Sequence, residues 1–192
     1  MAVAVACLFA GCVVQSVNPY YTTDSVCTVP GIGGEWTALD DQGKPESPRP
    51  WIIGPDKIFT FNKNGAPGTL KAVYFRIGET LFLDTTAEGP TQQMSAWWTM
   101  HVYPVHVVSR IDVKGDRLTL TPVDYNWIEK ALKDGRVKLP HLRQRGEDSL
   151  LFTASPEAWM DFLKKYARDG NVFSEKNALH LVRSKDSQDK AQ

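Results

Sequence analysis

The stretch "TLKAVYFRIGETLFLD", residues 69–84, contains the clearest structural signal in this chain of 192 residues. Two runs rich in apolar, β-branched and aromatic residues flank the dipeptide Gly78-Glu79. A glycine supplies the positive φ angle that the first central position of a type II′ turn requires, and such a turn joins antiparallel strands through two residues. The stretch therefore predicts a β-hairpin with strands at residues 69–77 and 80–84.

Further strand patterns lie on both sides of this hairpin. Upstream, "GEWTAL" begins at Gly34, and "KIFTF" is followed by "NKNGAPG", whose Asn64-Gly65 dipeptide is a turn signal. Downstream, "MHVYPVHVVSRIDV" and "RLTLTPV" flank Gly115 as a second hairpin. Pro104 lacks the backbone donor of a strand interior, which indicates a bend or an edge position there. "ALHLVRS" supplies a last strand near the carboxyl terminus.

Two helices are predicted to interrupt the strands. In "DYNWIEKALKDG", Asp124 is a candidate N-cap and Gly135 a candidate stop. In "SPEAWMDFLKKYARDG", Ser155 is a natural N-cap and Pro156 fits the first helical position. Apolar residues at positions i, i+3, i+4 and i+7 predict that the second helix packs on the core through Trp159, Phe162, Leu163 and Tyr166.

Together these elements predict an α+β fold in a single domain of residues 33–184. Its expected form is an antiparallel β-sheet of about seven or eight strands with two helices laid on it. The length suits one ordinary domain, and a hydrophobic content of 42% is enough for a sizeable core. Residues 185–192 lack large apolar side chains and are expected to be disordered.

Near the amino terminus, an apolar segment ends in "LFAGC", whose last residue is Cys12, and no charged residue precedes Asp24. The segment has the length of a signal-peptide h-region and is too short to span a bilayer. It resembles the type II signal of bacterial lipoproteins, in which small residues precede a cysteine. The resemblance implies that residues 1–11 are a cleaved signal peptide and that Cys12 carries diacylglycerol and an acyl chain such as palmitate. The alternative is a cytoplasmic domain in which "AVAVACLF" is a buried strand.

A lipid on Cys12 would decide where the protein resides. Residues 12–32, rich in Ser, Thr, Asn and Pro, are then expected to form a lipid-anchored tether. With Cys7 removed and Cys12 modified, Cys27 remains as a partly buried free thiol. Val13 stands where family members retained in the inner membrane carry Asp. For a Gram-negative host, the resemblance therefore implies the periplasmic face of the outer membrane.

The motif Gly34-Glu35-Trp36, just before a meander of antiparallel strands, resembles the Gly-x-Trp signature of the lipocalins. The resemblance implies an eight-stranded barrel with a C-terminal helix. Trp36 would then line the site in which many members bind a small apolar ligand. From the residues alone, the sheet either closes in this way or stays open against the helices. Trp97 and Trp98 are further ligand-binding candidates, because adjacent residues on a strand face opposite sides and one indole would be exposed.

The balance of charges and the absence of known catalytic motifs argue against several classes of function. The 22 basic and 22 acidic residues balance, which argues against a nucleic-acid partner. No nucleophile-elbow, P-loop or zinc-protease pattern occurs, and His101 and His106 would face opposite sides of a regular strand. We expect a non-catalytic cell-envelope lipoprotein without a cofactor or a metal. Besides the membrane, its partner would be either a small apolar ligand in the concavity of the sheet or another envelope protein.

Overall fold

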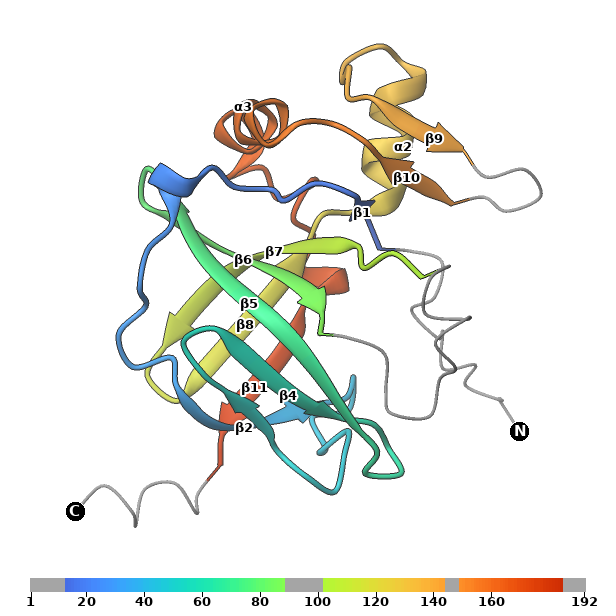
Figure 1. The fold of residues 1–192 in the computed structure, drawn as a ribbon. Helices are drawn as coiled ribbons and strands as arrows, with labels where there is room; N and C mark the ends of the chain where they lie inside the picture. The colour runs from blue at the N-terminus through green and yellow to red at the C-terminus, as the bar shows by residue number, and fades with distance from the viewer. Residues whose placement is uncertain (1–12, 89–101, 144–148, 185–192) are drawn as a thin grey trace, which may run out of the picture.

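The computed structural model describes residues 13–88, 102–143 and 149–184 of the protein. Within them the predicted α+β fold class is confirmed: eight antiparallel strands close into a barrel, and two helices lie outside it (Figure 1). The alternative of an open sheet is therefore wrong. The predictions of a signal peptide at residues 1–11 and a disordered tail at 185–192 lie outside the described residues.

The barrel strands follow one another around the barrel in chain order. The last strand closes the barrel by pairing with two others, with Leu179 opposite Leu120 and His180 opposite Leu39. Every neighbouring pair in the barrel is antiparallel. The eight strands are β2 (Gly34–Leu39), β3 (Trp51–Ile53), β4 (Lys57–Phe61), β5 (Pro67–Ile77), β6 (Thr80–Ala87), β7 (His106–Lys114), β8 (Arg117–Pro122) and β11 (Leu179–Arg183).

Tight turns join the strands where the sequence predicts them. Gly78 and Glu79 connect β5 to β6, and Gly78 has a φ angle of 58°, as the predicted turn requires. A second two-residue turn joins β7 to β8, with Gly115 also at a φ angle of 58°. Pro104 precedes β7, which begins at His106, so the proline lies outside the hydrogen-bonded ladder.

Both predicted helices form with the predicted N-caps. α2 (Tyr125–Lys133) begins after Asp124, whose Oδ1 accepts a hydrogen bond from the backbone N–H of Trp127 at 2.7 Å. α3 (Pro156–Tyr166) begins after Ser155, whose Oγ accepts from the backbone N–H of Ala158 at 3.3 Å. Short 3₁₀ turns, η1 (Thr23–Ser25) and η2 (Glu175–Asn177), complete the helical elements of the described residues.

Three short strands extend the sheet beyond the barrel. β1 (Gln15–Ser16) pairs with the first two residues of β7 and with β10 (Leu150–Phe152). β9 (His141–Arg143) pairs with β10 and is the last strand in the sheet order. β7 pairs with β8 from Ser109 onward, so β1 occupies the position beside β7 that β8 leaves vacant.

Residues 13–20, which we call the N-terminal strap, are not the flexible tether that their composition predicts. Val14 is 2% exposed and Tyr20 is fully buried. The backbone N–H of Tyr20 donates to Asp84 Oδ2 at 2.9 Å, and its hydroxyl donates to the carbonyl oxygen of Val14 at 3.0 Å. The tether prediction is wrong here because composition reports local preference, whereas Val14 and Tyr20 are buried by elements much later in the chain.

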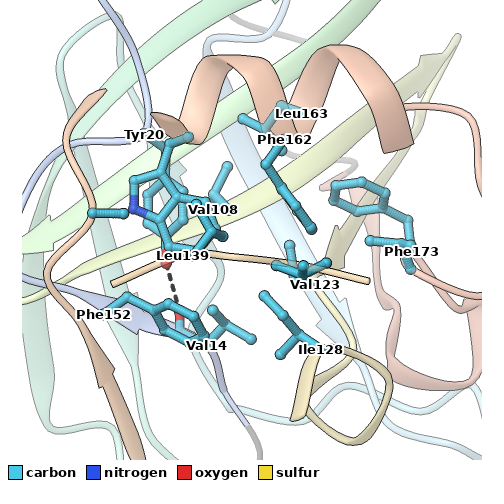
Figure 2. Packing of buried hydrophobic residues seen from close by; sticks show 14 of the residues in the cluster. Val14, Tyr20, Val108, Val123, Ile128, Leu139, Phe152, Phe162, Leu163 and Phe173 are labelled. Atoms are coloured by element: carbon cyan, nitrogen blue, oxygen red, sulfur yellow. Dashed lines mark hydrogen bonds between the residues drawn. The ribbon is translucent and has the colours of Figure 1, made fainter. Parts of the chain in front are cut away.

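Two hydrophobic cores lie on the two faces of the barrel wall. The inner core fills the barrel and consists of Ile32, Trp36, Ala38, Ile53, Ile58, Ala72, Tyr74, Leu83, Ile111, Leu118, Leu120 and Leu181. The outer core lies between the wall, the helices and the N-terminal strap (Figure 2). It consists of Val14, Tyr20, Phe75, Phe82, Val108, Val123, Tyr125, Ile128, Ala131, Val137, Leu139, Leu150, Phe152, Ala154, Trp159, Met160, Phe162, Leu163, Ala167, Val172 and Phe173.

Candidate functional site

The interior of the barrel is occupied by side chains of its own wall. The buried residues of the inner core are at most 7% exposed, and four partly exposed wall residues pack against them: Trp51, Leu70, Leu81 and Leu179. Trp36, predicted to line a ligand site, is fully buried among them, and its indole N–H donates to the carbonyl oxygen of Ile32 at 2.8 Å. A barrel of eight strands has an interior wide enough either for its own side chains or for one small ligand, and here the buried side chains of the wall lie in it. Trp36 therefore acts here as a packing residue of the inner core.

Arg183 covers Trp36 from the end of β11. Its guanidinium carbon lies 4.3 Å from the centroid of the indole ring, within the range of a cation–π interaction. The same guanidinium donates hydrogen bonds to the carbonyl oxygens of Gly33 at 3.1 Å and Gly31 at 2.6 Å. A molecule approaching Trp36 from this side would have to displace the arginine and break these contacts.

Of the other residues predicted as a lipid site, ligand contacts or a free thiol, the structure describes only Cys27, which packs against the inner core. Cys12, Trp97 and Trp98 lie outside the described residues. Cys27 is a half-buried free thiol, as predicted, and its backbone N–H donates to the carbonyl oxygen of Tyr74 at 2.9 Å. In the three described ranges, no helix is long and apolar enough to cross a membrane.

A buried carboxylate and a histidine meet on the outer face of the barrel wall. Asp84 on β6 is 2% exposed, and its Oδ1 lies 2.7 Å from Nδ1 of His106 on β7. The hydroxyl of Thr86 lies 3.1 Å from the same ring nitrogen. Burial raises the pKa of Asp84, although hydrogen bonds from His106 and from the backbone of Tyr20 partly offset that rise. Sequence analysis missed this pair, because nothing near "TLFLD" in the chain indicates a histidine partner.

The surroundings of this pair argue for a structural role. Ser16 lies opposite His106 in the strand register, and a serine beside a His–Asp pair can act as a nucleophile in acyl transfer. Ser16, however, is fully buried, and its Oγ accepts hydrogen bonds from Trp159 Nε1 at 3.0 Å and from the backbone N–H of Asn18 at 3.2 Å. The cluster therefore fastens the N-terminal strap to the barrel wall and presents no serine hydroxyl to a substrate.

A groove of about 450 Å³ opens to solvent between η1, the turn joining β5 to β6, and α3. Its walls carry acidic and basic side chains together, including Asp24, Arg76, Glu157 and Lys164. A hydrogen bond from the Thr22 side chain lowers the pKa of Asp24. The backbone N–H at the start of α3 and the Ser155 side chain lower the pKa of Glu157. Acidic and basic side chains line the groove together, so it favours neither an anion nor a cation.

An exposed apolar pair lies on the outer face of the barrel away from the helices. Ile52 on β3 and Phe59 on β4 are register partners, 41% and 40% exposed. Their chain neighbours Ile53 and Ile58 point into the barrel, so the pair must face outward. The sequence carries this signal, because two adjacent apolar residues in a barrel strand cannot both reach the interior.

Charged side chains of both signs border this pair: Glu35 is opposite Ile52 in the register, and basic residues lie on β4, on β5 and before β3. Lys57 and Lys71 are opposite each other in the register, on the same face of the wall as Phe59. The guanidinium carbon of Arg49 lies 4.1 Å above the ring centroid of Phe61 at the end of β4. Lys57 is bonded to Glu88 at 2.9 Å, which leaves Lys71 and Arg49 as the remaining positive charges. We call this surface the Ile52–Phe59 patch; it comprises Ile52, Phe59, Lys57, Lys71 and Arg49.

Comparisons with known proteins give no family for this chain: no protein-family model matches it, and no curated protein or solved structure is significantly similar to it. Across the described ranges, no group of three or more His, Cys, Asp and Glu side chains is arranged to hold a metal ion. The functional inference therefore depends on the filled interior, the buried Asp84–His106 pair and the Ile52–Phe59 patch.

Proposed function

We propose that this protein is a non-catalytic lipoprotein of the cell envelope whose barrel presents a docking surface to another envelope protein. The observation that carries this proposal is the filled interior of the barrel, with Trp36 fully buried beneath Arg183. A carrier of a small apolar ligand needs an enclosed space lined by apolar side chains. Here the apolar side chains that would line such a space occupy it.

The Ile52–Phe59 patch is the surface we assign to the partner. Apolar residues that are exposed side by side, with polar residues around them, are typical of protein-interaction sites. The patch is small, which suits a contact centred on one aromatic anchor. Glu35 opposite Ile52, together with Lys71 and Arg49, favours a partner whose apolar contact is bordered by charges of both signs.

The proposal of a lipid anchor is based on the sequence "LFAGC", which resembles lipoprotein signals. In this proposal Cys12 carries the lipid, and the protein resides on the periplasmic face of the outer membrane if its host is Gram-negative. Two or more acyl chains make such anchoring stable, whereas a single chain binds a membrane reversibly.

Intact-mass measurement of the protein extracted from its own host membranes tests the anchor. The expected mass is that of a chain beginning at Cys12 plus acyl groups, and a Cys12→Ala variant should lack the modification and leave the membrane fraction. An unmodified chain that retains Met1 would refute the lipoprotein proposal.

Photo-crosslinking in host cells tests the docking surface. A crosslinking amino acid at position 59 should give one reproducible protein adduct. The same group at Val113, an apolar residue that is 36% exposed near the carboxyl end of β7, should give none. Phe59→Glu should abolish the contact formed through position 52 while changing stability by less than about 1 kcal/mol, the range of strand propensities. Equal adducts at both positions, or a stoichiometric small molecule in native mass spectra, would contradict this part of the proposal.

A further inference from the structure

We infer that the end of the molecule carrying β1 and β9 lies directly against the lipid bilayer, with Leu142 in the membrane interface. This inference rests on the proposed lipid at Cys12, but it adds an orientation that the anchor alone does not supply. A lipid on a long flexible tether would leave the protein free to rotate above the membrane. From Val13 onward, where the described residues begin, the chain already pairs with the fold and forms no such tether.

The N-terminal strap begins at the residue that follows the anchor. Val13 forms a bridge with Asp124, and Val14 is already 2% exposed in the outer core. β1 begins at Gln15, three residues after Cys12. Three residues of fully extended chain span at most about 10 Å, so a lipid on Cys12 holds β1 close to the bilayer surface.

Strand register places Leu142 near this point. Gln15 on β1 is opposite Leu151 on β10, and Leu151 is opposite Leu142 on β9. These three side chains share the face of the small sheet opposite to the one that buries Ser16 and Phe152. Neighbouring strands are about 4.8 Å apart, so β9 lies about 10 Å from β1. Leu142 is therefore within reach of the same membrane surface as the anchor.

The exposed side chains at this end suit a bilayer interface. Leu142 is 61% exposed on the last strand of the sheet, and Tyr103, in the segment leading into β7, is 70% exposed. Tyrosine is enriched where protein meets lipid headgroups, because its ring is apolar and its hydroxyl remains hydrated. Lys138, exposed in the segment that leads into β9, adds a positive charge that favours anionic headgroups, whereas Arg143 is paired with Glu129 at 2.8 Å.

The overall arrangement agrees with this orientation. Figure 1 shows β9 and β10 at one end of the molecule and β4, which carries Phe59, at the opposite end. With β9 against the bilayer, the Ile52–Phe59 patch points away from the membrane and is open to a partner. Membrane contact and partner docking then occupy separate surfaces and do not compete.

Fluorescence quenching from lipid acyl chains tests the orientation. Lipidated full-length protein carrying Cys27→Ser is labelled with a nitrobenzoxadiazole group at Leu142→Cys or, as the matched control, at Phe59→Cys. Each sample is reconstituted in vesicles of phosphatidylethanolamine and phosphatidylglycerol that include lipids brominated on the acyl chains. We expect loss of fluorescence at position 142 and none at position 59. A label at Tyr103→Cys should be quenched as well.

The outcomes separate the orientation from the anchor, because the acyl mass on Cys12 is measured on the same samples. Acylated protein that shows no quenching at position 142, or stronger quenching at position 59, would overturn the orientation while the lipoprotein proposal stands. Protein without acyl groups would refute the anchor itself. Unfolding curves of the three labelled variants establish that each remains folded, so that a lost signal is not read as a change of orientation.

Discussion

The inner and outer cores use similar side chains but collect them from the chain in different ways. The inner core alternates along the barrel strands, as at Ala72 and Tyr74 or at Leu118 and Leu120, and follows the two-residue period of a strand. The outer core joins the N-terminal strap to elements far along the chain. Trp159 on α3, for example, contacts Tyr20 with ring centroids 4.4 Å apart.

The two cores also differ in the hydrogen-bond partners of their polar side chains. In the inner core, the side-chain hydrogen bonds of Trp36 and Tyr74 end on backbone carbonyls of neighbouring loops. In the outer core, Ser16 and Asp84 are buried and bonded to Trp159, Tyr20 and His106. Buried polar groups are costly when a partner is lost, so the outer core should be the more sensitive to changes at single hydrogen bonds.

The largest effect is expected inside the barrel, at Trp36→Ala. Removing a buried tryptophan costs about 3–5 kcal/mol of unfolding free energy, measured by chemical denaturation. Because the inner core is apolar, the space left behind should stay dry and bind benzene, as engineered apolar cavities do. Benzene should raise the melting temperature of the variant and leave the original protein unchanged. Stabilisation of the original protein by benzene would show that its interior is already open.

Trp159→Ala should cost a similar amount in the outer core, about 3–5 kcal/mol. The two tryptophan variants should differ in the segment that they loosen, because Trp159 contacts Tyr20 and Ser16 of the N-terminal strap. Hydrogen exchange should therefore accelerate at residues 13–20, while Trp36→Ala leaves that segment protected. Equal exchange of the strap in both variants would mean that the two cores unfold as one unit.

A smaller effect is expected from a matched pair of hydroxyl deletions. Tyr20→Phe removes the donor to the carbonyl oxygen of Val14, a residue 2% exposed, and should cost about 1–3 kcal/mol. Tyr74→Phe removes the donor to the carbonyl oxygen of Gly54, a half-buried residue that water can reach, and should cost about 0.5–1.5 kcal/mol. Denaturation midpoints measure both. A larger loss for Tyr74→Phe would contradict the greater sensitivity of the outer core.

The smallest effect concerns Asp84 and pH. Burial raises the pKa of Asp84 above its ordinary value of 3.8, so the folded state binds the proton more tightly than the unfolded state. This contribution to stability is fully present below the unfolded pKa and is lost as pH rises through the folded pKa. Asp84→Asn should remove that decline from plots of unfolding free energy against pH.

Asp112→Asn is the control for this comparison, because Asp112 is exposed on β7 and bonded to Lys114. It should keep the pH profile of the original protein. Identical profiles for the original protein and Asp84→Asn would mean that Asp84 does not titrate differently in the folded state.

Much of the fold could be predicted from the sequence because its signals are local. The turn at Gly78, the N-caps at Asp124 and Ser155, and the alternation of Leu118 and Leu120 involve residues a few positions apart. The candidate site was harder to predict. The outward direction of Phe59 follows from Ile58 beside it, but its proximity to Ile52 depends on the register between β3 and β4.

The sequence by itself determined every barrel strand except β3, the two helices and the tight turns, because backbone preference and hydrophobic period act over short stretches of chain. It did not indicate β3 or the short strands β1, β9 and β10. The tertiary structure alone decided three further features: the closure of β11 on β2, the filling of the barrel around Trp36, and the burial of the N-terminal strap. Each depends on contacts between residues far apart in the chain, whose free energy no local pattern reports. The strap shows this most plainly, since Tyr20 lies in a segment of tether-like composition and is buried by Asp84 and Trp159.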